Sequence, residues 1–365
     1  LVLTGGPGTG KTTLVRVLVE ASSRLGQDVH LAAPTGRAAK RLAEATGKEA
    51  KTLHRLLEFS FQAKGFQRNA ENPLPGGSYV VDEASMIDLS LAQALLDALP
   101  EDARLVLVGD VDQLPSVGAG SVLKDLIDSG VVPIVRLTEV FRQAQASLIV
   151  RNAHRINHGE LPLTPEEVGV VKPALSEFYL STVRGGEAAE TMVERLVCER
   201  LPEVFKLDPM RDIQVLCPMR QREASTDSIN RILQARLNPN GQPVGRAETR
   251  LRVGDRVMQL RNNYEKEVFN GDVGSITSFD SVDGVVVVDF DGRPVRFKTH
   301  ELDDLTLAYA CTVHKAQGSE YPAVVLTLMR SHWVLAQRNL VYTALTRARR
   351  VAIFVADPVA LKHAV

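Results

Sequence analysis

The sequence predicts an α/β protein with two parallel-sheet lobes, and three observations lead to that prediction. Residues 1–138 alternate short apolar runs with helical patterns, which is typical of parallel strands connected by helices. Residues 251–305 change to short strand-like runs punctuated by Asp-Gly turns. From Leu307 onward the alternating pattern returns, so we expect the small β unit to be inserted into a second α/β lobe.

The expected elements follow from apolar runs for strands and from helical spacing for helices. In the first lobe, strands are expected at residues 1–4, 29–33, 79–81 and 104–110, and helices at 11–23, 37–45 and 89–99. In the second, strands are expected at 212–217, 323–327 and 351–356, and helices at 225–237 and from 338. In the β unit, strands are expected at 256–260, 274–279, 285–290 and 295–298.

One stretch of the first lobe breaks its alternating pattern. It has alternating aromatic residues, then a Lys-Gly turn and several prolines, which predicts an inserted β-hairpin. The expected boundaries are 1–57 and 77–138 for the first lobe, 58–76 for the hairpin, 139–244 and 306–365 for the second lobe, and 245–305 for the small β-barrel.

Composition narrows the class of protein without naming a partner. The 365 residues are 44% hydrophobic, enough for sizeable cores, and the net charge of −1 says nothing about an acidic ligand. Local charge is more informative: residues 31–68 hold eight Lys or Arg against three acids, and residues 330–350 hold five Arg and no acid. Each run is either a surface that contacts phosphates or a solvated helix face.

Several features bear on compartment and metals. Cys198, Cys217 and Cys311 are far apart in sequence, which fits reduced thiols in a cytoplasmic protein. His154 and His158 are four residues apart, but no third ligand is evident, so we do not expect zinc. No apolar run approaches the length of a membrane-spanning helix, and no signal peptide is evident. Because the chain starts at Leu1, we expect it to belong to a longer protein.

The most specific motif opens the chain. A short apolar strand runs into Gly5-Gly6-Pro7-Gly8-Thr9-Gly10-Lys11-Thr12 and then into a helical pattern, which matches the phosphate-binding loop G-x-x-x-x-G-K-T. Glycines let backbone N–H groups face phosphate oxygens, and the helix presents its positive end to the same anion. The expected nucleotide-binding residues are Gly6, Pro7, Gly8, Thr9, Gly10, Lys11, Thr12 and Thr13.

Acidic and amide side chains follow two later strands. Lys11 is expected to reach the β- and γ-phosphates, while the Thr12 hydroxyl and Asp82 are expected to bind Mg²⁺. Glu83 is placed to orient and deprotonate an attacking water, and Gln113 to touch that water and the γ-phosphate. The sequence therefore predicts hydrolysis of a nucleoside triphosphate.

Further polar motifs suggest a nucleic-acid ligand and a second contribution to the phosphate. Thr35, Gly36 and Arg37 follow the second strand and suit a nucleic-acid phosphate. Arg142 lies just beyond a strand, and Arg347 is expected on a helix. An arginine offered by a second lobe to a γ-phosphate held by the first is an arginine finger.

Taken together, the motifs resemble the RecD-like helicases of superfamily 1. They occur in order along nearly the whole chain: GGPGTGKT, APTGRAAKRL, TLHRLL, VVDEASM, VGDVDQLPSVGAG, LTEVFRQ, TVHKAQGSE and YTALTRARR. The resemblance implies two RecA-like motor lobes, a hairpin in the first and an SH3-like barrel in the second. It also implies ATP-driven 5′→3′ movement on single-stranded DNA and unwinding at a duplex fork.

The resemblance also implies roles for individual residues. Lys11, Thr12, Asp82, Glu83, Gln113, Arg142 and Arg347 would form the ATPase centre, with ATP and Mg²⁺ bound. Thr35, Gly36, Arg37, His54, Thr312, His314 and Lys315 would face DNA. We expect a monomeric motor without a membrane partner, and a RecBCD-like complex stays open.

Other functions stay open on the sequence alone. The chain could be a single-stranded DNA translocase or a motor that displaces proteins without strong unwinding, or its substrate could be RNA. A nucleotide-gated DNA-binding module with an inactive motor is disfavoured, because Lys11, Glu83, Gln113 and Arg347 are all present.

Overall fold

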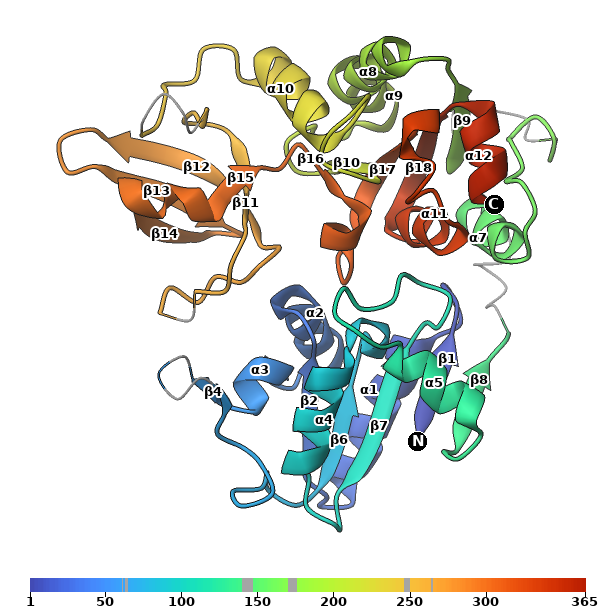
Figure 1. Ribbon diagram of the computed structural model, residues 1–365, viewed down its shortest axis with the longest axis vertical. Coiled ribbons are helices and arrows are strands. Elements are labelled where there is room, and N and C mark those ends of the chain that lie inside the picture. Colours follow the sequence, from blue (N-terminus) through green and yellow to red (C-terminus); the bar gives the residue numbers. More distant parts are fainter. Residues whose placement is uncertain (61, 63–64, 140–146, 170–175, 246–249, 264) are drawn as a thin grey trace. The chain divides into compact units, whose positions relative to one another are not determined.

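The computed structural model describes residues 1–365 except 61, 63–64, 140–146, 170–175, 246–249 and 264. Its contacts divide the chain into two compact units, Leu1–Ala146 and Ser147–Val365. Figure 1 shows the elements of each unit.

Unit 1 is built on a six-stranded parallel sheet. The strand order is β3-β2-β6-β7-β1-β8, and every neighbouring pair is parallel. The strands are β1 (Val2–Gly5), β2 (Val29–Ala33), β3 (Ala50–Thr52), β6 (Ser78–Val81), β7 (Arg104–Gly109) and β8 (Ile134–Leu137). The helices are α1 (Lys11–Arg24), α2 (Gly36–Thr46), α3 (Leu53–Leu56), α4 (Leu89–Ala98) and α5 (Val122–Ser129). The expected strands and helices of this lobe are confirmed to within a few residues.

Both faces of this sheet are covered, which explains why its strands are continuously apolar. Val15 and Val19 of α1 pack in one core with Val80 and Val108 of the sheet. A second core joins α4, including its Leu95, and α5 to sheet residues such as Val81 and Leu107. The parallel arrangement brings the carboxyl ends of β1, β2, β6 and β7 to one edge of the sheet.

The hairpin of unit 1 is shorter than the sequence suggested. In the described part of this segment β4 (Phe59–Ser60) pairs with β5 (Gly65–Phe66), and the Phe59 and Phe66 rings lie 5.2 Å apart. The rest of the expected insertion returns along the lobe: Leu74 is 4% exposed, packs in the core, and donates its N–H to the Ala98 carbonyl at 2.8 Å. The sequence could not show this, because the partners of Leu74 lie about 20 residues further along the chain.

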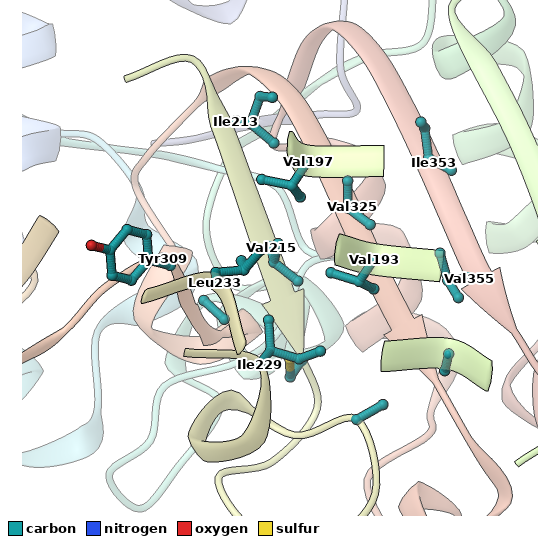
Figure 2. Packing of buried hydrophobic residues seen from close by; sticks show 14 of the residues in the cluster. Val193, Val197, Ile213, Val215, Ile229, Leu233, Tyr309, Val325, Ile353 and Val355 are labelled. Carbon is teal, nitrogen blue, oxygen red and sulfur yellow. The ribbon is translucent and has the colours of Figure 1, made fainter. Parts of the chain in front are cut away.

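Unit 2 contains a second parallel sheet, in the order β16-β10-β17-β18-β9. Its strands are β9 (Phe178–Thr182), β10 (Ile213–Cys217), β16 (Ala310–Thr312), β17 (Tyr321–Leu328) and β18 (Ala348–Ala356). Its helices are α7 (Leu148–Asn157), α8 (Gly186–Arg195), α9 (Leu201–Phe205), α10 (Thr226–Leu237), α11 (Arg338–Leu345) and α12 (Pro358–Ala364). Figure 2 shows Val193 and Leu233 from the helical side packing with Val215, Val325 and Val355 of the sheet.

A five-stranded antiparallel sheet forms the small β unit, in the order β14-β13-β12-β11-β15. Its strands are β11 (Arg256–Gln259), β12 (Val273–Asp280), β13 (Val285–Phe290), β14 (Arg293–Lys298) and β15 (Leu305–Leu307). It has its own core, which includes Ile276 and Phe297. Asp291 and Gly292 have φ of 54° and 88°, as the two central residues of a type I′ hairpin turn require.

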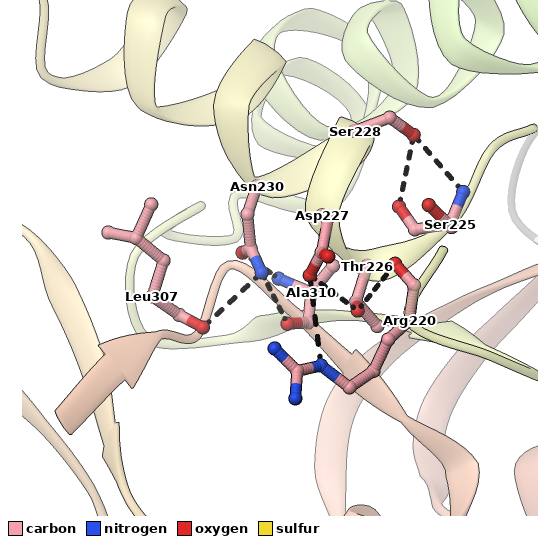
Figure 3. Close-up of polar contacts among 8 residues, drawn as sticks. All are labelled: Arg220, Ser225, Thr226, Asp227, Ser228, Asn230, Leu307 and Ala310. Carbon is pink, nitrogen blue, oxygen red and sulfur yellow. Dashed lines mark hydrogen bonds and ion pairs between the residues drawn. The ribbon is translucent and has the colours of Figure 1, made fainter. Parts of the chain in front are cut away.

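Buried polar contacts join this β unit to the parallel sheet of unit 2. The Arg256 guanidinium donates to the Ile213 carbonyl at 2.7 Å and to Gln214 Oε1 at 2.9 Å. On α10, Asn230 donates to the carbonyls of Leu307 and Ala310, at 3.3 and 3.0 Å (Figure 3). Helix α10 therefore holds the point where the chain leaves the β unit and re-enters the parallel sheet.

Among the described residues, no helix has the length and apolar character needed to cross a membrane.

Candidate nucleotide site

The loop between β1 and α1 has a backbone that only glycine adopts easily. Gly8 and Gly10 have φ of 73° and 87°, in the left-handed region. A Cβ on Gly5 would lie 2.7 Å from the Leu137 carbonyl oxygen and 2.8 Å from Thr9 Oγ1. The loop thus runs tightly into the N-terminus of α1, whose first N–H groups and dipole favour an anion.

The side chains of this loop hold it in shape. Lys11 Nζ donates to the carbonyls of Gly5 at 2.6 Å and Gly6 at 2.9 Å, and Thr9 Oγ1 donates to Gly6 at 2.8 Å. Thr12 and Thr13 are exposed at the start of α1. Lys11 is therefore tethered to the loop that the motif assigns to phosphate, and its flexible stem lets it exchange carbonyl partners for phosphate oxygens.

Paired carboxylates follow β6 at the same edge of the sheet. Asp82 is half-buried and accepts a hydrogen bond from the Glu83 N–H at 2.8 Å, while Glu83 has a left-handed φ of 51°. Burial and the neighbouring Glu83 charge raise the pKa of Asp82 to about 6, and the Lys11 and Arg41 charges oppose that rise. Two carboxylates in partial burial create a negative site that a cation would stabilise.

Gln113 follows β7, which lies between β6 and β1 in the sheet. It is 9% exposed, and its Nε2 donates to Asp110 Oδ2 at 3.3 Å. The phosphate loop, Asp82, Glu83 and Gln113 thus come from three neighbouring strands. Parallel strands bind ligands at this edge.

The first group of predicted DNA-facing residues follows two neighbouring parallel strands, β2 and β3. Thr35 caps α2, accepting from the Ala38 N–H at 3.2 Å, and Gly36 and Arg37 open that helix beyond β2. They lie on the edge that carries the phosphate loop. His54 follows β3 at the same edge, and its half-buried ring lies 5.8 and 5.6 Å from the Phe59 and Phe66 rings; burial lowers its pKa.

The second group lies in unit 2, at the end of β16 and in the short turn that follows it. Thr312 accepts from the Lys315 N–H at 3.4 Å and so closes a short turn. His314 and Lys315 are half-buried, and burial lowers both pKa values. The charge of Arg220 lowers the pKa of Lys315 further. Neither Arg220 nor Arg41 is among the site residues that the sequence predicts. The signal for Arg41 was its place one helical turn after Arg37.

Arg347 lies after its expected helix. Helix α11 ends at Leu345 and β18 begins at Ala348, so Arg347 occupies the tight connection between them. It is 3% exposed, and its guanidinium donates to the carbonyls of Ser319 at 3.2 Å and Thr343 at 3.3 Å. The structure thereby brings Arg347 against the segment that follows Lys315. Arg142 lies outside the described residues.

The other arginines of the run 330–350 have partners within unit 2. Arg330 pairs with Asp357 at 3.0 Å and Arg349 with Glu320 at 2.7 Å, and Arg350 donates to the Phe205 carbonyl at 3.4 Å. These three arginines therefore form ion pairs or hydrogen bonds within unit 2.

No cluster of three or more His, Cys, Asp or Glu side chains that could hold a metal is found in the part of the chain that the structure describes. His158 Nδ1 lies 2.7 Å from the His154 carbonyl oxygen, a contact within the last turn of α7.

Three segments of the chain match models of known protein families. The AAA domain model matches residues 1–172, the SH3 domain model of ATP-dependent RecD-like DNA helicases matches 229–290, and the UvrD-like helicase C-terminal domain model matches 307–355. The SH3 match starts within α10, consistent with the polar contacts between that helix and the β unit.

Two curated relatives are similar over nearly the whole chain. The ATP-dependent RecD2 DNA helicase of Deinococcus radiodurans is 42% identical over 349 residues, covering 96% of this chain and 46% of the relative. The RecBCD enzyme subunit RecD of Mycobacterium tuberculosis is 33% identical over 409 residues, covering 100% of this chain and 68% of the relative. The chain thus spans about half of the first relative and two thirds of the second.

The phosphate loop, the paired carboxylates and the two parallel sheets define a P-loop nucleotide-binding protein with two RecA-like lobes. The chain is 33% identical to the RecD subunit and covers 68% of that relative's length, which narrows the class of protein to one family. The chain belongs to the RecD-like family of helicases.

Solved structures support the same fold. A structure of two Pif1 helicases at forked duplex DNA has a TM-score of 0.58 at 22% identity, covering 100% of this chain and 89% of the other. The structure of Bacteroides Pif1 bound to single-stranded DNA has a TM-score of 0.56 at 21% identity, covering 100% of this chain and 90% of the other. The predicted fold class is confirmed: two RecA-like parallel-sheet lobes with an SH3-like β unit in the second.

Proposed function

We propose that this chain is the motor region of an ATP-dependent DNA helicase that moves 5′→3′ on single-stranded DNA and unwinds duplex DNA. The observation that carries the proposal is the gathering of the phosphate loop, Asp82, Glu83 and Gln113 at one edge of the unit 1 sheet. In that set, the loop would bind an anion and Asp82 would bind a cation. Glu83 would act as a base, and Gln113 would form a hydrogen bond with water.

Each of these groups has a chemical role in the proposed hydrolysis. The loop N–H groups and Lys11 would hold the β- and γ-phosphates. Glu83 would take the proton of the attacking water, and Gln113 would orient that water. Arg142 and Arg347 would stabilise charge on the γ-phosphate, with Arg347 contributed by unit 2.

The residues present suit magnesium. Mg²⁺ prefers hard oxygen ligands, and the exposed Thr12 hydroxyl and the Asp82 carboxylate are of that kind. The adjacent, partly buried carboxylates of Asp82 and Glu83 support a cation there, and their proximity helps to raise the pKa of Asp82. When bound, Mg²⁺ would neutralise phosphate charge, while Asp82 and Thr12 would keep it beside Lys11.

Single-stranded DNA is the proposed track, and the DNA-facing residues remain a proposal. They are Thr35, Gly36, Arg37, His54, Thr312, His314 and Lys315. We propose a monomeric, cytoplasmic motor; the similarity to RecD also supports a RecBCD-like complex as the alternative.

Hydrolysis and unwinding assays test the function directly. ATPase activity should rise with single-stranded DNA more than with duplex DNA or RNA, and 5′-tailed duplexes should unwind while 3′-tailed duplexes do not. Stimulation without unwinding would instead identify a translocase, and stronger stimulation by RNA would reassign the substrate. ATPase activity that no nucleic acid stimulates would contradict the proposal.

The short hairpin provides a test of strand separation. Replacing residues 61–64 with Gly and Ser keeps Phe59, Phe66 and the buried Leu74, so the lobe should stay folded. We expect DNA-stimulated ATPase to persist and unwinding to be lost. The matched control replaces residues 281–283, an exposed turn in the β unit, and should leave both activities unchanged.

A further inference from the structure

A buried aspartate at the end of β7 has no role in the hydrolysis proposed above. Asp110 is 2% exposed and follows Gly109. A Cβ on Gly109 would lie 2.8 Å from Leu123 Cδ2 and 3.2 Å from the Ser85 backbone nitrogen. The end of β7 is therefore packed tightly against the turn that begins directly after Glu83, and Asp110 starts from a fixed position beside the site.

The contacts of Asp110 organise the turn that carries Gln113. Its Oδ1 accepts from the Asp112 N–H at 3.1 Å, and its Oδ2 accepts from Gln113 Nε2 at 3.3 Å. The Gln113 N–H also donates to the Asp110 carbonyl at 3.3 Å. Backbone and side chain of Gln113 are thus both bonded to the same residue.

The chemistry of these groups decides which way the amide of Gln113 faces. An ionised carboxylate only accepts hydrogen bonds, whereas an amide has a donor nitrogen and an acceptor oxygen. Oδ2 of Asp110 must therefore face the nitrogen of Gln113, which turns Oε1 away from Asp110. An acceptor is what a water needs when its hydrogen is to be directed while its lone pair attacks phosphorus.

We infer that Asp110 is a positioning residue for hydrolysis, whose carboxylate orients the Gln113 amide so that Oε1 is presented to the attacking water. This inference rests on the proposed ATPase function.

Asp110→Asn tests the orientation with minimal change of shape. Asn can keep an oxygen on the Asp112 N–H, and it then presents an amino group to Gln113, so the Gln113 amide reverses. We expect kcat for DNA-stimulated hydrolysis to fall about 10- to 100-fold, less than the 10²–10³ typical of losing a direct transition-state contact. KM for ATP should stay within about threefold, because an interaction made only in the transition state lowers kcat without raising KM.

A rescue variant separates orientation from general damage to the turn. In Asp110→Asn/Gln113→Glu, one Glu oxygen accepts from the new amide and the other is available to water. Gln113→Glu alone would place two carboxylates at hydrogen-bond distance and should be poorly active. The double variant should therefore have a higher kcat than either single variant. Asp112→Asn removes the same charge from the same turn and serves as the matched control.

The outcomes are distinct. Wild-type kcat in Asp110→Asn, or a double variant whose kcat does not exceed that of the more active single variant, would overturn the inference. If Asp110→Asn melts far below the wild type while the double variant remains poorly active, Asp110 is structural and the inference is again overturned. Absence of ATP hydrolysis by the wild-type chain would refute the proposed function instead.

Discussion

Asp82 at the edge of the unit 1 sheet and Asp255 in unit 2 are both carboxylates inside the protein, but their surroundings differ. Asp255 is 0% exposed. Among the described residues it accepts hydrogen bonds from the Tyr309 hydroxyl at 2.9 Å, Gln234 Nε2 at 2.6 Å, Asn238 Nδ2 at 2.7 Å and the Arg252 N–H at 2.7 Å. Gln234 lies on α10 and Asn238 directly follows that helix, whereas Arg252 precedes β11 and Tyr309 lies between β15 and β16. The carboxylate therefore joins the β unit to the second lobe.

Asp82 has a different electrostatic balance. It stands beside a second carboxylate, Glu83, and its pKa is raised to about 6. Protein donors therefore compensate the Asp255 charge, whereas the surroundings of Asp82 oppose its charge. The difference teaches how to separate structural from functional acids: a structural carboxylate is supplied with donors, and a functional one carries charge that a ligand would stabilise.

Arg347 extends the comparison to a buried basic side chain. Its guanidinium is hydrogen-bonded within the protein, as the Asp255 carboxylate is, yet it is predicted to act in ATP turnover. Arg347→Ala should lower ATP turnover by about 10³–10⁵, the usual value of an arginine finger, while single-stranded DNA binding without nucleotide stays near normal. Steady-state ATPase and DNA-binding titrations measure the two effects. Arg349→Ala, which breaks an exposed ion pair with Glu320, is the control. Normal turnover by Arg347→Ala would make this arginine purely structural.

Glu83→Gln tests whether the paired carboxylates are functional. We expect turnover to fall about 10²–10⁴-fold, because the general base is removed. ATP binding should persist, since Asp82 and Lys11 are unchanged, and a fluorescent nucleotide titration measures it. Glu101→Gln, an exposed substitution in the same unit, should behave like the wild type. Near-normal hydrolysis by Glu83→Gln would show that another group is the base.

Asp255→Ala addresses the structural side of the comparison. Several buried donors would lose their acceptor, so we expect unit 2 to be destabilised by about 3 kcal/mol or more. Trp333, in unit 2, is the single tryptophan of the chain, so its fluorescence during urea denaturation reports on that unit. Asp303→Ala, at an exposed position, should change stability by less than about 0.5 kcal/mol. A similar small effect at Asp255 would refute the distinction.

Asp82→Asn should change the free energy of unfolding by the smallest amount, and it should stabilise the protein where Asp255→Ala destabilises it. The folded-state pKa of Asp82 is raised from 3.8 to about 6, so the wild type loses stability as pH rises through that window. Without nucleotide or metal, the variant should be more stable by roughly 1–3 kcal/mol at pH 8, and the gain should vanish near pH 4. Thermal melts across this range measure the difference, with exposed Asp97→Asn as control. A gain that grows toward low pH would contradict the assigned cause.

Much of the fold and of the nucleotide site could be predicted from sequence because the signals are local. The glycines of the phosphate loop, the apolar runs of β6 and β7 and the Asp-Gly turns each specify a backbone conformation within a few residues. Parallel pairing then requires that acids and amides at successive strand ends share one edge. Glu83 and Gln113 were predictable for that reason.

By itself, the sequence determined the order and type of many strands and helices, the glycine loop and the residue types at the strand ends. It did not predict β3, β9, α5, α8 or α12. Only the tertiary structure decided that Leu74 returns to the unit 1 core, that the His54 ring packs with Phe59 and Phe66, and that Arg347 bonds the Ser319 carbonyl. It also decided which acids are compensated, as the comparison of Asp82 with Asp255 shows. Each of these depends on burial or on partners brought together by folding, and no local pattern encodes such contacts.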